Sequence, residues 1–184
     1  MARERTTVKT AEQRPAGTED AWRILDTVRD WTKHAETKAA TTLAASGVLV
    51  GVLYSLVTGG GSDAPGFVVA AAVTAVCAVA AGVTAGLALW PRQRIADPTL
   101  PTSLLFYDHI GRAYATSHAD YRDRLHALLR DEEAMVSAVA EQIWANALVA
   151  RRKYRWVGRS VGLLLVALTA LAVAAVLSAV ERVR

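Results

Sequence analysis

Four side chains that could bind a small anion lie close together in one short segment. They are Tyr107, Asp108, His109 and Arg112. An arginine suits a phosphate group, and an aromatic ring or an amide can hold a nucleotide base. The segment is therefore a candidate site for a small anionic nucleotide. The alternative interpretation is a helix at a membrane surface, with Phe106 and Tyr107 as its aromatic anchors.

A second cluster is basic and ends in an aromatic residue. It comprises Arg151, Arg152, Lys153, Arg155 and Trp156. Basic residues accumulate beside membrane spans on the cytoplasmic side, and tryptophan is enriched where the membrane meets water. The cluster therefore predicts a membrane anchor that also attracts anionic lipid. A contribution to anion binding is the alternative.

The remaining polar residues show no pattern typical of catalysis or metal binding. The four histidines lack the HExxH spacing and form no ligand cluster with the single cysteine, Cys77. Cys77 lies within an apolar stretch, where we expect it to act as a small apolar residue. We therefore expect no enzyme activity, no catalytic residue, no metal and no cofactor.

Three long stretches without charged residues must position these clusters. Residues 39–62, 64–91 and 160–180 contain no Asp, Glu, Lys or Arg. A helix needs about 20 apolar residues to cross the hydrocarbon core of a bilayer. The sequence therefore predicts an all-α integral membrane protein with three transmembrane helices. We place these helices at 39–57, 67–90 and 161–180.

The segments outside the spans are expected to be helical or short. We predict a disordered leader at 1–17, an amphipathic helix at 18–38, an outer loop at 58–66, a cytoplasmic helical segment at 91–160 and an outer tail at 181–184. Since no Gly or Pro lies between the amphipathic segment and the first span, one helix should run from Glu19 to Val57. Another should run from Ala119 to Val180, with Gly158 as the single weak point before the third span. Two spans would thus extend into a cytoplasmic helical bundle.

The distribution of charge predicts the orientation of the chain. Its net charge is +4, but basic and acidic residues nearly balance in each soluble segment, which argues against nucleic acid as a partner. The loop at 58–66 contains Asp63 and no basic residue. By the positive-inside rule, the N-terminus and the 91–160 segment should face the cytoplasm, with the C-terminus outside. We expect a multi-pass protein of the bacterial inner membrane.

Each span has a pair of glycines four residues apart in it or beside it. The pairs are Gly47 and Gly51, Gly82 and Gly86, and Gly158 and Gly162. Two glycines at this spacing lie on one helix face and let a neighbouring backbone approach closely. The pairs therefore predict close helix packing, within the chain or between subunits of a homo-oligomer. Chance is the alternative in spans so rich in Gly and Ala.

Three parts of the chain resemble the Pycsar effector transmembrane family. They are the run from Ala35 to Gly51, the run from Ser103 to Gly111, and the segment from Gln142 to Trp156 with its Arg-Arg-Lys-Tyr-Arg-Trp end. The resemblance implies a bacterial antiphage effector that responds to cyclic UMP or cyclic CMP made by a cognate cyclase. It further implies damage to inner-membrane integrity and abortive infection. No cyclic-nucleotide-binding β-barrel is recognisable, so the nucleotide site should be helical and shared between subunits.

The residues alone leave a second function open. Long helical stalks attached to membrane spans would also suit a constitutive membrane scaffold. Such a scaffold would recruit a cytoplasmic partner through its stalks, with Trp22, Ile24 and Trp31 as contact residues.

Overall fold

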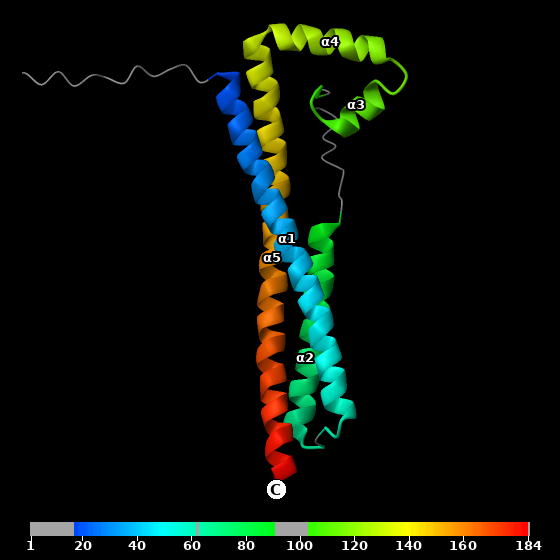
Figure 1. The fold of residues 1–184 in the computed structure, drawn as a ribbon, viewed down its shortest axis with the longest axis vertical. Coiled ribbons are helices and arrows are strands. Elements are labelled where there is room, and N and C mark those ends of the chain that lie inside the picture. The colour runs from blue at the N-terminus through cyan, green and yellow to red at the C-terminus, as the bar shows by residue number, and fades with distance from the viewer. Residues whose placement is uncertain (1–16, 62, 91–102, 184) are drawn as a thin grey trace, which may run out of the picture. The chain divides into compact units, whose positions relative to one another are not determined.

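The computed structural model describes residues 17–61, 63–90 and 103–183, and these residues form five helices and no strand. The helices are α1 (Thr18–Thr58), α2 (Pro65–Leu89), α3 (Tyr107–Ala113), α4 (His118–Arg130) and α5 (Glu132–Val183) (Figure 1). The all-helical prediction is therefore confirmed. The leader predicted at 1–17 lies, except for Gly17, outside the described residues, and so do residues 91–102 of the cytoplasmic segment.

Helix α1 is one long helix, as predicted from the lack of a breaker. Glu19 and Asp20 occupy its first turn, where carboxylates interact favourably with the positive end of the helix dipole. The helix then continues without interruption from an amphipathic half into an apolar half. Three of the described helices, α1, α2 and α5, are long and apolar enough to cross a membrane. The predicted spans fall within these helices, apart from Trp90 at the end of the second.

The predicted helix from Ala119 to Val180 is wrong at its beginning. Helix α4 ends at Arg130, and α5 starts at Glu132 after an extended residue, Asp131. The Asp131 carboxylate accepts a hydrogen bond from the backbone N–H of Ala134 at 3.0 Å. An aspartate that caps a new helix in this way offers the backbone an alternative to continuing the previous helix. The acidic run of Asp131 and its two glutamates is therefore a helix start.

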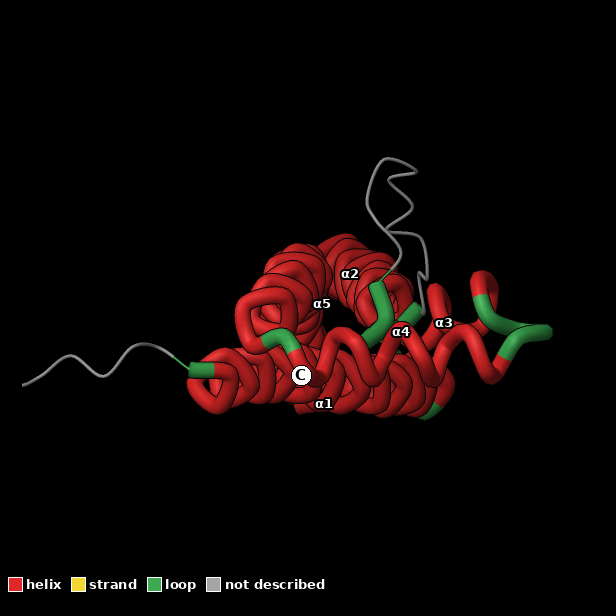
Figure 2. The backbone as a smooth tube through the Cα atoms, turned by 90° about the horizontal axis from the view of Figure 1, so that it is seen from above, coloured by secondary structure: helices red, strands yellow, loops and turns green. Residues whose placement is uncertain are grey.

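The described chain packs as two units. One contains the described parts of Met1–Leu25 and Thr102–Gln142, and the other those of Asp26–Pro101 and Ile143–Arg184. Helices α1 and α5 each contribute to both units. In the second unit, α1, α2 and α5 lie side by side, as the end-on view shows (Figure 2).

Small side chains fill the core of the second unit at three levels. The first level contains Ala35, Ala39, Ala88 and Val157, the second Leu49, Ala78 and Ala167, and the third Phe67, Ala70 and Ala174. Helices gain little from the hydrophobic effect in lipid, so alanines that allow close van der Waals contact stabilise their association. Hydroxyl groups add no link between these helices at Thr42, Ser46 or Thr74, because each donates to a carbonyl of its own helix.

The turn between α1 and α2 requires glycine. Gly60 has a positive φ of 97°, a region that other residues rarely adopt. A Cβ on Gly61 would lie 2.9 Å from two atoms of the Phe67 ring, so the ring would have to shift to admit a side chain there. The short turn therefore returns the chain directly into α2 at Pro65.

Candidate functional site

Ser103 organises the segment that leads into α3. Its backbone N–H donates to Nδ1 of His109 at 3.0 Å, and its Oγ accepts from the backbone N–H of Leu105 at 3.3 Å. The same Oγ accepts a hydrogen bond from Nε2 of Gln142, on α5, at 2.7 Å. The serine thus joins the start of α3 to α5 within one compact unit.

Aromatic side chains attach α4 to the same segment. The Tyr121 hydroxyl donates to the carbonyl oxygen of Leu104 at 3.4 Å. The rings of Tyr114 and Tyr121 lie 5.5 Å apart, and the guanidinium of Arg124 is 6.0 Å from the Tyr114 ring. The residues on both sides of α3 are therefore held in place, although no residue of α3 is itself fully buried.

The four predicted ligand residues do not all face the same way. Asp108 and Arg112 form an ion pair at 2.9 Å, in which the aspartate side chain is 18% exposed and the arginine 63%. Tyr107 is also exposed. The His109 ring packs edge-on against Phe106 and accepts the Ser103 N–H. A ring nitrogen that accepts a hydrogen bond carries no proton, so any N–H of the neutral imidazole is on Nε2.

This arrangement leaves Arg112 as the group on α3 best suited to an anion. The guanidinium remains 63% exposed within this ion pair, so a phosphate can still reach it from solvent. Tyr107 presents an aromatic face on the same short helix. His109 instead accepts the backbone N–H of Ser103 and so stabilises the fold of this segment.

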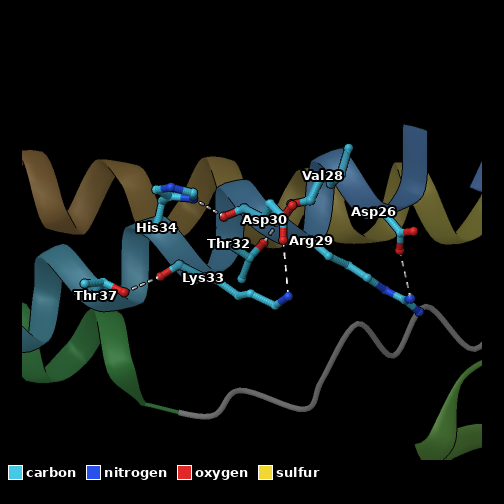
Figure 3. A network of polar contacts seen from close by, with 8 residues as sticks. All are labelled: Asp26, Val28, Arg29, Asp30, Thr32, Lys33, His34 and Thr37. Atoms are coloured by element: carbon cyan, nitrogen blue, oxygen red, sulfur yellow. Dashed lines mark hydrogen bonds and ion pairs between the residues drawn. The ribbon is translucent and has the colours of Figure 1, made fainter. Parts of the chain in front are cut away.

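Asp26, Asp30 and His34, in the N-terminal half of α1, find partners within their own helix. Asp26 pairs with Arg29 at 3.6 Å, and Asp30 with Lys33 at 3.2 Å. His34 contacts the carbonyl oxygen of Asp30 through Nδ1 at 2.7 Å (Figure 3). Such pairs between residues three or four apart are typical of a solvated helix face. The stalk therefore offers no cluster of like charges for an anionic ligand.

The predicted membrane anchor divides into outward and inward residues. Arg151, Arg152 and Arg155 are exposed, whereas Trp156 packs against the core cluster of Ala35, Ala39, Ala88 and Val157. Lys153 is only 17% exposed and forms an ion pair with Glu36 of α1. This ion pair links α1 to α5 next to the core cluster that contains Ala35, Ala39 and Ala88.

Replacement of Lys153 by methionine should loosen this junction. We expect the free energy of unfolding to fall by about 1 kcal/mol, a modest loss because Glu36 stays 46% exposed and can be hydrated. Arg152→Met, which removes an exposed charge next to it, is the matched control. Detergent-based unfolding of the full-length protein measures both. Equal midpoints for the two variants would show that the ion pair adds nothing.

Of the six predicted packing glycines, Gly82 has a neighbour in another helix. A Cβ at Gly82 would lie 3.5 Å from the Cβ of Ser46 on α1. At the other five positions, a Cβ would have nothing within 4 Å. Gly47 and Gly51 therefore face away from the core of their own chain.

One exposed face of α1 is rich in small residues along its apolar half, and Leu43 and Tyr54 are also exposed there. It contains Ala40, Ala44, Gly47, Gly51, Ser55 and Thr58, all exposed and at helical spacing. The outward face of α2 instead contains Val68, Val69, Val73, Val76, Val79 and Val83. Branched apolar side chains suit contact with lipid, whereas small residues favour contact with another helix.

Comparison with known proteins agrees with this architecture. The sequence matches the Pycsar effector protein domain (PycTM) over residues 20–180, which is most of the chain. The protein belongs to the Pycsar effector family. The Pycsar effector protein PtPycTM of Propioniciclava tarda is 32% identical over 146 residues, which cover 78% of this chain and 71% of that protein. No solved structure matches the chain significantly. Membership of this family supports a membrane-bound antiphage effector.

In this Pycsar effector, sequence reasoning missed the hydrogen bond that holds the candidate site to α5. Ser103 and Gln142 both fall in segments that resemble the family, but neither was singled out as a site residue. Their side chains meet across 39 residues of chain. No periodicity indicates such a pair, and the one local signal was a polar residue, Gln142, on the apolar side of a predicted helix.

Proposed function

We propose that the protein is a membrane effector of an antiphage cyclic-nucleotide signalling system. Cyclic UMP or cyclic CMP, made by a cognate cyclase, activates it, and the active protein impairs inner-membrane integrity and causes abortive infection. The observation that carries the proposal is an exposed cation and aromatic ring, on Arg112 and Tyr107, in a chain of the Pycsar effector family with three apolar spans.

The chemistry of α3 supports a cyclic mononucleotide as the ligand. The Arg112 guanidinium would bind the cyclic phosphate, and the Tyr107 ring would stack on the base. Asp108 lies at the other end of the arginine ion pair and can accept a hydrogen bond from a base N–H. No metal is needed for this binding. Among the described residues, no three His, Cys, Asp or Glu side chains lie together as metal ligands.

The spans support membrane damage through altered helix packing. None of the three charge-free stretches supplies an ionised side chain, which argues against a selective ion pathway lined by charges. The small-residue face of α1 would instead associate with a second copy of the chain. A homo-oligomer built in this way could rearrange between tight and leaky states if the ligand binds one of them better. The positive-inside pattern supports a cytoplasmic N-terminus and an outer C-terminus.

Thermal unfolding of the detergent-purified protein tests the ligand. Cyclic UMP, CMP, AMP and GMP are added in turn, the two purine nucleotides serving as controls. A ligand at 100 times its Kd stabilises the protein by about 2.7 kcal/mol, which raises the midpoint measurably. We expect this shift with a pyrimidine nucleotide only. A well-folded protein that responds to none of the four would contradict the proposed ligand.

The second candidate function is a constitutive scaffold, which two exposed residues of the stalk favour. Ile24 and Trp31 on α1 are each about half exposed, at 53% and 52%. A tryptophan in such a position is typical of protein contact sites. The scaffold would show no nucleotide response, and a partner would co-purify only while these side chains are intact. Trp31→Ala with unchanged toxicity and nucleotide response would exclude it.

A further inference from the structure

Gln142 is a buried polar residue that follows two buried apolar residues on one face of α5. Met135, Val139 and Gln142 recur at spacings of four and three along α5, and all three are buried. Gln142 is only 6% exposed. A buried amide costs free energy unless it is hydrogen-bonded, and a leucine at this position would continue the apolar face. Its amide Nε2 meets Ser103 Oγ at 2.7 Å.

The Gln142 bond reaches the candidate nucleotide segment through one residue. Ser103 receives the amide on its Oγ and holds His109 of α3 through its own backbone N–H. His109 is adjacent in sequence to Asp108, which pairs with Arg112. A ligand that engages Arg112 therefore acts on a short helix whose first turn is hydrogen-bonded, through Ser103, to α5.

We infer that Gln142 is a positioning residue that couples nucleotide binding at α3 to the membrane response through α5. The inference rests on the proposed function and deepens it by assigning the route of regulation. Helix α5 is unbroken from Glu132 to Val183, so the helix that carries Gln142 is the helix that carries the third span. Ligand binding changes the hydrogen bond between Ser103 and Gln142, and α5, which contains both Gln142 and the third span, carries the effect to the membrane. Gln142 itself does not touch the nucleotide.

Two readouts on the same full-length protein separate coupling from binding. Calorimetry measures the affinity for cyclic UMP and cyclic CMP, and dye release from proteoliposomes measures the membrane response. For Gln142→Leu, which keeps the position buried, we expect affinity within about threefold of the wild type. We expect the response to fall by about 5- to 150-fold, the usual range for coupling between two sites.

Variants of Ser103 test the same bond from its other side. Ser103→Ala removes the acceptor and should reproduce the loss of response, even where Gln142→Leu does not give folded protein. Ser103→Thr keeps the hydroxyl and should restore the response. Glu141→Gln changes the exposed neighbour of Gln142 and is the matched control, with both readouts unchanged.

Any result other than retained binding with a reduced membrane response would contradict the proposed role of Gln142. Retained binding with a retained response would show that the bond transmits nothing. Loss of binding in Gln142→Leu and Ser103→Ala would show that the bond builds the site. A wild-type protein that binds neither nucleotide would overturn the proposed function itself, and the coupling with it, a result that is visible before any variant is made.

Discussion

Arg112→Ala is expected to weaken binding of the activating nucleotide by about 10- to 150-fold. A hydrogen bond to a charged group contributes about 1.5–3 kcal/mol, which corresponds to this range. We expect the whole of this binding free energy to be lost, because Arg112 is the residue of α3 that combines a fixed positive charge with exposure. Calorimetric titration of the purified protein with cyclic UMP and cyclic CMP measures the change.

Two further variants make the Arg112 result specific. Arg130→Ala removes an exposed arginine from the end of α4 and should leave the affinity unchanged. Arg112→Lys keeps the charge but loses the bidentate geometry, so we expect an intermediate affinity. Normal binding by Arg112→Ala would place the phosphate elsewhere. It would leave the family assignment untouched, because that assignment does not depend on this residue.

Ala167→Leu is expected to destabilise the three-helix core by about 1–3 kcal/mol, the usual cost of overpacking. Ala167 is fully buried and packs with Leu49 of α1 and Ala78 of α2. Three additional carbon atoms cannot fit there unless a neighbouring helix moves outward. Detergent-based unfolding of the full-length protein measures the loss of stability.

The matched control uses the same substitution on the outer face of the same helix. Ala172→Leu lies five residues further along α5, where the side chain is exposed and can extend into lipid. We expect no loss of stability in this variant. If both variants unfolded alike, the predicted contact of Ala167 with α1 and α2 would be wrong.

Local sequence signals account for most of the fold. The charge-free stretches place the spans because the cost of burying a charge in lipid depends on the residue itself. The long helix α1 follows from the absence of Gly and Pro between Thr18 and Ser46, so that nothing breaks the helix where its amphipathic half meets its apolar half. The loop predicted at 58–66 likewise contains three consecutive glycines, Gly59 to Gly61, and the turn between α1 and α2 lies there.

The break between α4 and α5 shows where a local signal was read wrongly. Asp131, Glu132 and Glu133 are a typical helix start, since an aspartate cap is followed by carboxylates in the first turn. The same residues also fit a solvated face in the middle of a helix, as the predicted helix from Ala119 to Val180 implies. Choosing between the two needs the backbone angles at Asp131, which no residue pattern supplies.

The candidate site was predictable in its membership but not in its geometry. Tyr107, Asp108, His109 and Arg112 could be chosen because they adjoin one another in the sequence. Their orientations depend on partners outside the segment. Ser103 and Phe106 engage the imidazole of His109, whereas the arginine stays exposed.

The sequence by itself determined an all-helical membrane protein with three spans, a charged stalk before the first span and a polar segment suited to an anion. These features follow from hydropathy and helix signals, which act between near neighbours in the chain. Only the tertiary structure decided which residues meet across helices. Glu36 pairs with Lys153 over a separation of 117 residues, and Ser103 meets Gln142 over 39. Such contacts depend on the packing of separate helices, and neither residue type nor spacing along one helix specifies a partner on another.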